Sequence, residues 1–288
     1  MTDILAMANA AAATGPNMTE AQKGGGGDYT PPAAGVALCR FVGYVELGKH
    51  TREIPGKPPK EENQVRLVFE LHGPRHEPKK LDDGTLLPHR LSIDTNLSLN
   101  EKANFFKLFQ RMNYEGKATH MSQLLGQPFL CTVVHEKSKA DPTKVFARLK
   151  DDSGYTIRPP RQEDALTGET KVIPVPPAIS PLRLFIWNAT PDFIGKMWDS
   201  LFIDGEYEPG RTKNVLQDQI KKANNFVNSP IFQHLQTSGV QMELGAGKGN
   251  AATPVAQSAA PSGGSGGVAA GTATPTSASP SDDPLAHV

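Results

Sequence analysis

Apolar and polar residues alternate along the first third of the chain. Residues 36–48 (VALCRFVGYVELG) have the apolar, β-branched and aromatic content of a long strand, and a loop rich in Lys, Pro and Gly follows at 49–63. Residues 65–73 and 89–99 alternate with a period of two, which predicts two further strands. The positions that we expect to face inward on these two strands are Leu67, Phe69, Leu71, Leu91 and Ile93.

A helix is expected after the third strand. Ser98 and Glu101 have the spacing of a capping box, and the helical pattern continues to about Asn113. A short turn at 121–125 precedes two more strands, which we place at 128–136 and 143–151. The apolar stripe of the helix consists of Ala103, Phe106, Phe109 and Met112.

The order of these elements is strand, strand, strand, helix, strand, strand. This order is that of the OB-fold, a small five-stranded Greek-key barrel that binds oligonucleotides. A generic α+β sandwich has the same elements and remains an alternative. We therefore predict a mainly β protein with helices, whose residues 28–158 form an OB-fold-like barrel with the helix between strands 3 and 4.

The region after the predicted barrel changes in composition. Residues 159–181 are Pro-rich and are expected to form a linker, whereas residues 182–235 are expected to form a helical appendix. Thr190 and Pro191 mark a helix start, and a second helix is expected at about 213–228. Two helices alone make a poor core, so we expect them to pack on the barrel or on another subunit. Their apolar stripes are Ile194, Met197, Trp198 and Leu201, then Leu216, Ile220, Ala223 and Val227.

Both ends of the chain have the composition of disordered segments. Residues 1–27 are Ala- and Gly-rich, and residues 236–288 consist mostly of Gly, Ala, Pro, Ser and Thr with an acidic tip. The start of the chain lacks the basic cluster of a secretory signal, and no window approaches the roughly 18 apolar residues of a membrane span. We expect no membrane association.

The charge is balanced overall but unevenly distributed. The chain has 30 basic and 30 acidic residues, yet the segment from Tyr29 to Arg158 holds 20 Lys or Arg against 15 Asp or Glu. A mildly basic body with an acidic tail favours a polyanion as partner. Cys39 and Cys131 both lie in apolar runs, which predicts buried free thiols and a reducing compartment.

Basic and aromatic residues share the outward positions of the predicted strands. Single-stranded nucleic acid requires such a combination, because cations neutralise phosphates and aromatic rings stack on bases. A solvated sheet face also carries such residues, so this second interpretation stays open. The candidate nucleic-acid-binding residues, including those of the loop between the first two strands, are Arg40, Tyr44, Lys49, Arg52, Lys57, Lys60, Arg66, Arg90, Lys144, Phe146 and Arg148.

Enzyme motifs are missing from the sequence. It contains no GxGxxG, GxxxxGK[ST], HExxH or GxSxG pattern. His72 and His76 could in principle clamp a metal, but Gly73 and Pro74 prevent a helix there and no third ligand is near. We therefore expect no catalytic site, no metal and no cofactor.

Several short segments between residues 28 and 205 have a recognisable combination of residues. They are DYTPPAAG at 28–35, VRLVFEL at 65–71, LSLNEKA at 97–103, LLG at 124–126, VVH at 133–135, FIWN at 185–188 and MWDSL at 197–201. Together they resemble segments of phage-encoded OB-fold single-stranded-DNA-binding proteins.

This resemblance implies a protein that coats single-stranded DNA during phage replication, recombination or repair, in the cytoplasm of an infected bacterial host. It also implies that the tail recruits replication or recombination proteins, with the tip residues Asp282, Asp283, Pro284 and Leu285 as contacts. The bacterial form of such a tip has several acids and ends in Pro-Phe, whereas this chain continues to Ala286, His287 and Val288.

Two other functions fit the same features. The first is a protein-interaction module of the phage replication machinery with weak or no DNA contact, and the second is a virion or assembly protein. The lack of a long hydrophobic assembly surface counts against the second.

Overall fold

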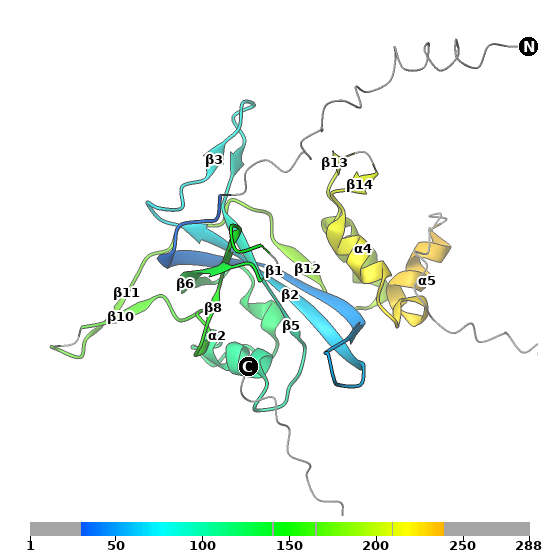
Figure 1. Ribbon diagram of the computed structural model, residues 1–288, viewed down its shortest axis with the longest axis horizontal. Helices are drawn as coiled ribbons and strands as arrows, with labels where there is room; N and C mark the ends of the chain where they lie inside the picture. The colour runs from blue at the N-terminus through cyan, green and yellow to red at the C-terminus, as the bar shows by residue number, and fades with distance from the viewer. Residues whose placement is uncertain (1–29, 140, 165, 209, 239–288) are drawn as a thin grey trace, which may run out of the picture.

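The computed structural model describes residues 30–238 apart from 140, 165 and 209 (Figure 1). The described part is mainly β with some helices, as expected from the sequence. Its main sheet has the order β5–β2–β1–β6–β7 with antiparallel neighbours, and a further strand, β12, pairs in parallel with β1. The strands of this sheet are β1 (Gly35–Arg52), β2 (Lys60–His72), β5 (Arg90–Asn96), β6 (Pro128–Lys137), β7 (Val145–Arg148) and β12 (Arg183–Phe185).

Short hairpins and helices surround this sheet. The hairpins are β3 (Lys79–Lys80) with β4 (Leu86–Leu87), β8 (Lys150–Asp151) with β9 (Gly154–Tyr155), β10 (Arg161–Glu163) with β11 (Thr170–Val172), and β13 (Glu206–Glu208) with β14 (Arg211–Thr212). The helices are α2 (Asn104–Met112), α3 (Pro191–Ser200), α4 (Val215–Lys221) and α5 (Pro230–Thr237), with 3₁₀ turns η1 (Met121–Leu124) and η2 (Phe226–Asn228). No helix in the described part of the chain has the length and apolar character needed to cross a bilayer.

The sheet does not close into a barrel, so the predicted closed form is wrong. β5 and β7 end the hydrogen-bonded path and lie beside each other without pairing. β7 has only four residues, and all of them pair with β6. The side chain of Tyr155 of β9 instead lies close to Thr95 of β5.

A β-bulge in β1 changes which side chains face inward. The pairing of β1 with β2 shifts between Phe41 and Gly43, so Val42 is the extra residue. Phe41 and Tyr44 therefore point to the same face, although strict alternation would place them on opposite faces. The first core holds both residues, together with Phe69 of β2 and Phe105 of α2.

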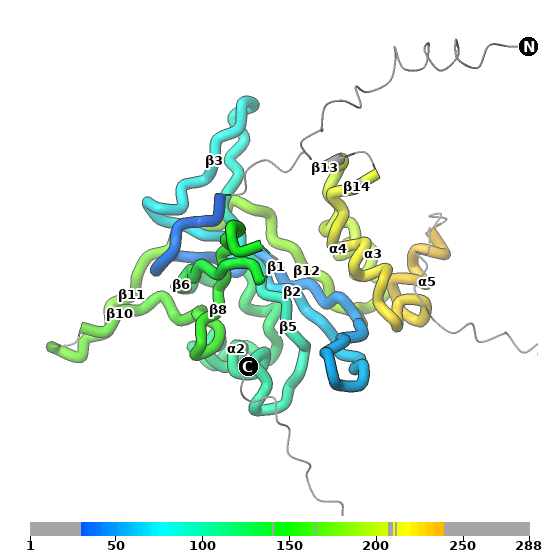
Figure 2. The backbone as a smooth tube through the Cα atoms, in the orientation of Figure 1, coloured from blue at the N-terminus to red at the C-terminus, as the bar shows by residue number. Residues whose placement is uncertain are grey.

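A second core lies on the other face of the same strand. Beyond the bulge, Val45 and Leu47 point outward, but α3, α4 and α5 cover them (Figures 1 and 2). Phe185 and Trp187 enter this core from β12 and the turn after it. The helical unit, residues 182–235, therefore packs on the sheet, and the second half of β1 is buried on both faces.

The helix boundaries differ in part from the sequence prediction. The capping box is wrong: α2 begins after Ala103 without a side-chain cap, and Ser98 belongs to the preceding turn. α3 begins at Pro191 as expected. The helix expected at 213–228 is shorter than predicted, and Val227 is 54% exposed because the chain turns into η2 there.

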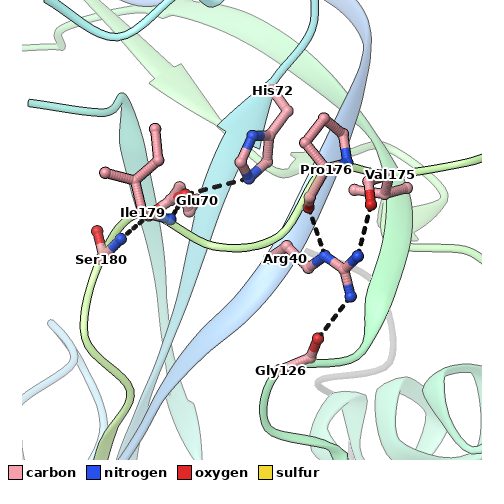
Figure 3. Close-up of polar contacts among 8 residues, drawn as sticks. All are labelled: Arg40, Glu70, His72, Gly126, Val175, Pro176, Ile179 and Ser180. Atoms are coloured by element: carbon pink, nitrogen blue, oxygen red, sulfur yellow. Dashed lines mark hydrogen bonds and ion pairs between the residues drawn. The ribbon is translucent and has the colours of Figure 1, made fainter. Parts of the chain in front are cut away.

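The segment that we expected to be a linker, 159–181, has structure of its own. It contains the β10–β11 hairpin, and its residues 175–180 cross the outward face of β1 and β2 (Figure 3). We call residues 175–180 the strap. Prolines suit such a segment, because they cannot donate to a sheet ladder.

Close packing at Gly48 joins the sheet to the helical unit and gives a first prediction. Gly48 has φ +85°, and a Cβ there would lie 2.3 Å from a ring carbon of Trp187 and 2.7 Å from Cβ of Ala223. Gly48→Ala should therefore lower the free energy of unfolding by about 2–4 kcal/mol, as the sum of backbone strain and overpacking. Chemical denaturation of both proteins measures this difference.

Gly56→Ala is the matched control. Gly56 has a similar φ of +81°, but nothing lies within 4 Å of its added Cβ. This variant should lose only the backbone contribution of about 1–2 kcal/mol. Equal losses in the two variants would show that the contact with Trp187 is not tight.

Candidate nucleic-acid interface

Tyr44 does not lie on the sheet surface, contrary to the sequence prediction. Its side chain is 1% exposed, and its hydroxyl donates to Oε1 of Glu46 at 2.8 Å. Burial, and then the charge of Glu46, raise the pKa of Tyr44. The bulge at Val42 is the cause, and a ring in this position cannot stack on a base.

Arg40 points outward as predicted, but its guanidinium holds the strap. Nε donates to the carbonyl oxygen of Pro176 at 2.7 Å and Nη2 to that of Val175 at 2.5 Å (Figure 3). Nη1 donates to the carbonyl oxygen of Gly126 at 2.8 Å. Three of its five N–H donors are thus used within the protein, so Arg40 has a structural role here.

Glu70 fastens the other end of the strap. Its side chain is fully buried, and its two oxygens accept the backbone N–H groups of Ile179 and Ser180, each at 2.7 Å (Figure 3). Nε2 of His72 lies 3.1 Å from Oε1 of Glu70. A buried carboxylate requires such donors, because leaving it unpaired would cost several kcal/mol.

Arg66 is neutralised on its own face of the sheet. It stands opposite Asp94 in the β2–β5 pairing, and the two side chains form a bidentate contact with both distances at 2.6 Å. Such cross-strand pairs stabilise a sheet. Arg66 therefore contributes little net positive charge to the surface.

Arg90 does not pair with the acid that stands opposite it, because that acid binds the strap. Glu70 stands directly opposite Arg90 in the pairing, but both oxygens of Glu70 face the N–H groups of the strap. Among the described residues, no carboxylate forms an ion pair with Arg90. Arg90 is exposed, so its charge is available to a ligand.

Arg183 of β12 joins Arg90 on this face, and the sequence analysis missed it. Arg183 stands opposite Gly43, Gly43 opposite Val68, and Val68 opposite Ser92. Because Gly43 has no side chain, a guanidinium from β12 can extend over β1 towards β5.

The two guanidiniums are close enough to influence each other. Burial, and then the positive charge of Arg90, lower the pKa of Arg183. No ion pair links Arg183 to a carboxylate within the part of the chain that the structure describes. The apolar residues Leu182, Leu184 and Phe185 around Arg183 were the sequence signal for this strand, but the neighbouring prolines pointed to a linker.

The predicted loop residues lie at the far end of the β1–β2 hairpin. Lys49, Arg52, Lys57 and Lys60 are all exposed. Lys60 lies 3.2 Å and Arg52 3.9 Å from Glu62, so this acid partly offsets their charge. They form a group separate from Arg90 and Arg183, because β1 and β2 continue between the two sites past the helical unit.

The predicted residues of the last strand lie on β7 and the turn before it. Lys144 lies 3.6 Å from Asp141, and Arg148 forms an ion pair with Glu136 of β6. Phe146 is 41% exposed. β7 lies beside β5 at the opening of the sheet, which brings Phe146 to the same edge as the third strand. The tail residues Asp282, Asp283, Pro284 and Leu285 lie outside the described residues.

Other chemistry-bearing groups form no site. Cys39 and Cys131 are buried free thiols, as predicted, and burial raises the pKa of Cys39. Among residues 30–238 without 140, 165 and 209, no group of three His, Cys, Asp or Glu residues could hold a metal ion. Comparison of the chain with models of protein families, with curated proteins and with solved structures finds no match.

The buried histidines give a prediction on pH. Burial lowers the pKa of His72, with Glu70 opposing the shift and Arg40 adding to it, and burial also lowers the pKa of His76. A histidine whose pKa is lower in the folded than in the unfolded state favours folding at a pH above its unfolded-state pKa of about 6.5. This contribution to stability is lost as the pH falls through the pKa of the folded state. The thermal midpoint of unfolding should therefore be lower at pH 5 than at pH 7.5.

Two variants separate this effect from general acid sensitivity. His76→Gln should reduce the difference between the midpoints at pH 7.5 and pH 5, since it removes one of the two groups. Gln162→Ala should leave the difference unchanged, because Gln162 is exposed and carries no titratable group. A midpoint that is equal at both pH values would show that these histidines do not titrate below their usual range.

Proposed function

We propose that this protein binds single-stranded DNA without strong sequence preference. The observation that carries the proposal is the pair Arg90 and Arg183, two neighbouring guanidiniums on one sheet face with no carboxylate partner among the described residues. A phosphodiester chain gains affinity from cations that the protein has not already neutralised. Arginine suits this role because its planar fork matches phosphate oxygens.

The strand order supports the proposal. The path β5–β2–β1–β6–β7 is the order expected of an OB-fold that is open between its third and fifth strands. In that fold the second and third strands and the loops beside them bind oligonucleotides. Arg90 lies on the third strand, and the cations of the β1–β2 loop form a second, separate group at the end of that hairpin.

Base contacts come from an exposed ring at the same edge. Phe146 on β7 is 41% exposed beside β5, and stacking on an aromatic ring contributes about 1–3 kcal/mol per base irrespective of its identity. Phosphate contacts and stacking together give affinity without sequence readout. We place this activity in phage replication, recombination or repair, in the cytoplasm of an infected bacterial host, with the tail recruiting partner proteins.

A protein-interaction module remains the second candidate because of exposed rings on the helical unit. Phe193 of α3 and Phe202 just after it are each 56% exposed. Binding of a replication protein that persists after nuclease treatment, together with no affinity for oligonucleotides, would favour this second function.

The salt dependence of binding tests the proposal. Fluorescence anisotropy with labelled oligo-dT should show binding that weakens steeply between two NaCl concentrations and exceeds binding to a duplex of equal length. Replacing both Arg90 and Arg183 by Gln should weaken binding by about tenfold or more and lower the slope of log affinity against log salt by about 1–2, because two phosphate contacts are lost.

Lys107→Gln is the control for a general loss of charge. Lys107 is exposed on α2, away from the proposed interface. This variant should bind oligo-dT almost as tightly as the wild type. Unchanged affinity and slope in the double arginine variant, with its thermal midpoint preserved, would overturn the assignment of this interface.

A further inference from the structure

A second cationic site lies at the end of the sheet where β1 begins and β2 ends, beyond the level of Arg90. A cavity of about 390 Å³ is bounded by the start of β1, the turn after β2, β6 and the segment around β10 and β11. Its apolar floor and walls include Val36, Leu38, Leu130 and Ile173. The volume is near the lower end of the range of about 300–1,000 Å³ for small-molecule sites.

The polar groups in this cavity are all neutral or basic. Arg75, Arg158, His72, His76 and Gln162 line it, and no Asp or Glu is among the lining residues. Neither arginine forms an ion pair with a carboxylate in the described part of the chain. Two arginines that share a cavity without an acid favour an anionic ligand.

Arg75 is fixed in place before any ligand binds. Nη1 donates to the carbonyl oxygen of Ala34 at 3.1 Å and Nη2 to that of Val36 at 3.0 Å. The guanidinium lies against Gly35, where a Cβ would come within 3.0 Å of Nη2. These two contacts use two of the five N–H donors, so three remain for a ligand.

Arg158 provides a second guanidinium, which no hydrogen bond or ion pair holds within the described residues. Its backbone bridges Leu130, with both N–O distances at 2.9 Å, which fixes the position of its Cα at the cavity wall. Its side chain is exposed. The fixed guanidinium of Arg75 and the exposed one of Arg158 can therefore donate hydrogen bonds to the oxygens of a single phosphate from two sides.

We infer that this cavity binds a terminal phosphate attached to a base-sized apolar body, as in a nucleoside monophosphate. Arg75 and Arg158 hold the phosphate, and the apolar walls formed by Leu38, Leu130 and Ile173 contact the body. The ligand has two sources: a free mononucleotide, or the phosphorylated end of a DNA strand. The inference does not rest on the proposed function, because none of these residues belongs to the interface of Arg90 and Arg183.

Calorimetric titration with deoxythymidine 5′-monophosphate tests the inference. The full-length protein should bind it saturably at one site, and thymidine, which has no phosphate, should bind much more weakly. Arg158→Gln should weaken binding by about tenfold or more, because it removes charge-assisted hydrogen bonds. The side chain of Arg158 makes no hydrogen bond or ion pair within the described structure, so the variant should keep the wild-type thermal midpoint.

Lys171→Gln is the matched control, because Lys171 is exposed on the β10–β11 hairpin beside the cavity and does not line it. It should bind the monophosphate as the wild type does. No saturable binding, or equal binding by Arg158→Gln, would overturn the inference, whatever the affinity for oligo-dT.

Oligo-dT with and without a 5′-phosphate distinguishes the two sources. Tighter binding of the phosphorylated strand that disappears in Arg158→Gln would identify the strand end as the ligand. Equal binding of both strands, with retained binding of the monophosphate, would identify the free mononucleotide.

Discussion

The contact between the buried carboxylate of Glu70 and the backbone of the strap determines how the surface of this protein is divided. Glu70 accepts the N–H groups of Ile179 and Ser180, and Arg40 holds the other end of the strap through the carbonyls of Val175 and Pro176. A carboxylate with no exposed surface must keep such donors, so the strap is fixed to the sheet. The strap then leads the chain directly into β12.

This constraint explains why the cations of the outward face have different roles. Arg66 keeps its cross-strand acid, Asp94, and is neutralised. Arg90 faces an acid whose oxygens serve the strap, so its charge remains uncompensated on the sheet. The strap also places Arg183 beside Arg90. The buried carboxylate of Glu70 therefore leaves Arg90 without an acidic partner among the described residues, and through the strap it also positions Arg183. Together the two arginines form the proposed phosphate contacts.

The sequence predicted the elements of the fold better than the surface they present. The strands over β1, β2, β5 and β6 follow from alternation and apolar content, and Pro191 marked the start of α3. The bulge at Val42 left no local signal, because any residue can occupy it, and it moved Tyr44 into the core. The predicted closure was wrong because β5 and β7 do not pair, and whether two strands so far apart in the sequence pair depends on the tertiary path of the chain.

The candidate site was predictable only where a side chain's role is set by its own strand. The alternation of its strand placed Arg90 outward, and it is exposed in the structure. Arg40 was assigned to DNA because nothing in the sequence shows that a segment about 135 residues later covers it. Arg183 was missed because prolines surround a three-residue strand. Long-range contacts of irregular backbone are the part of this structure that residue patterns do not encode.

Amide hydrogen exchange at Ile179 and Ser180 tests the central claim most directly. In the wild type both amides should be protected, and in Glu70→Gln they should exchange about tenfold faster or more, because both hydrogen bonds, which are partly buried, lose a charged acceptor. Glu163→Gln, on the exposed β10 strand, should leave their exchange unchanged. Equal protection of the two amides in the wild type and in Glu70→Gln would contradict the claim that Glu70 holds the strap on the sheet.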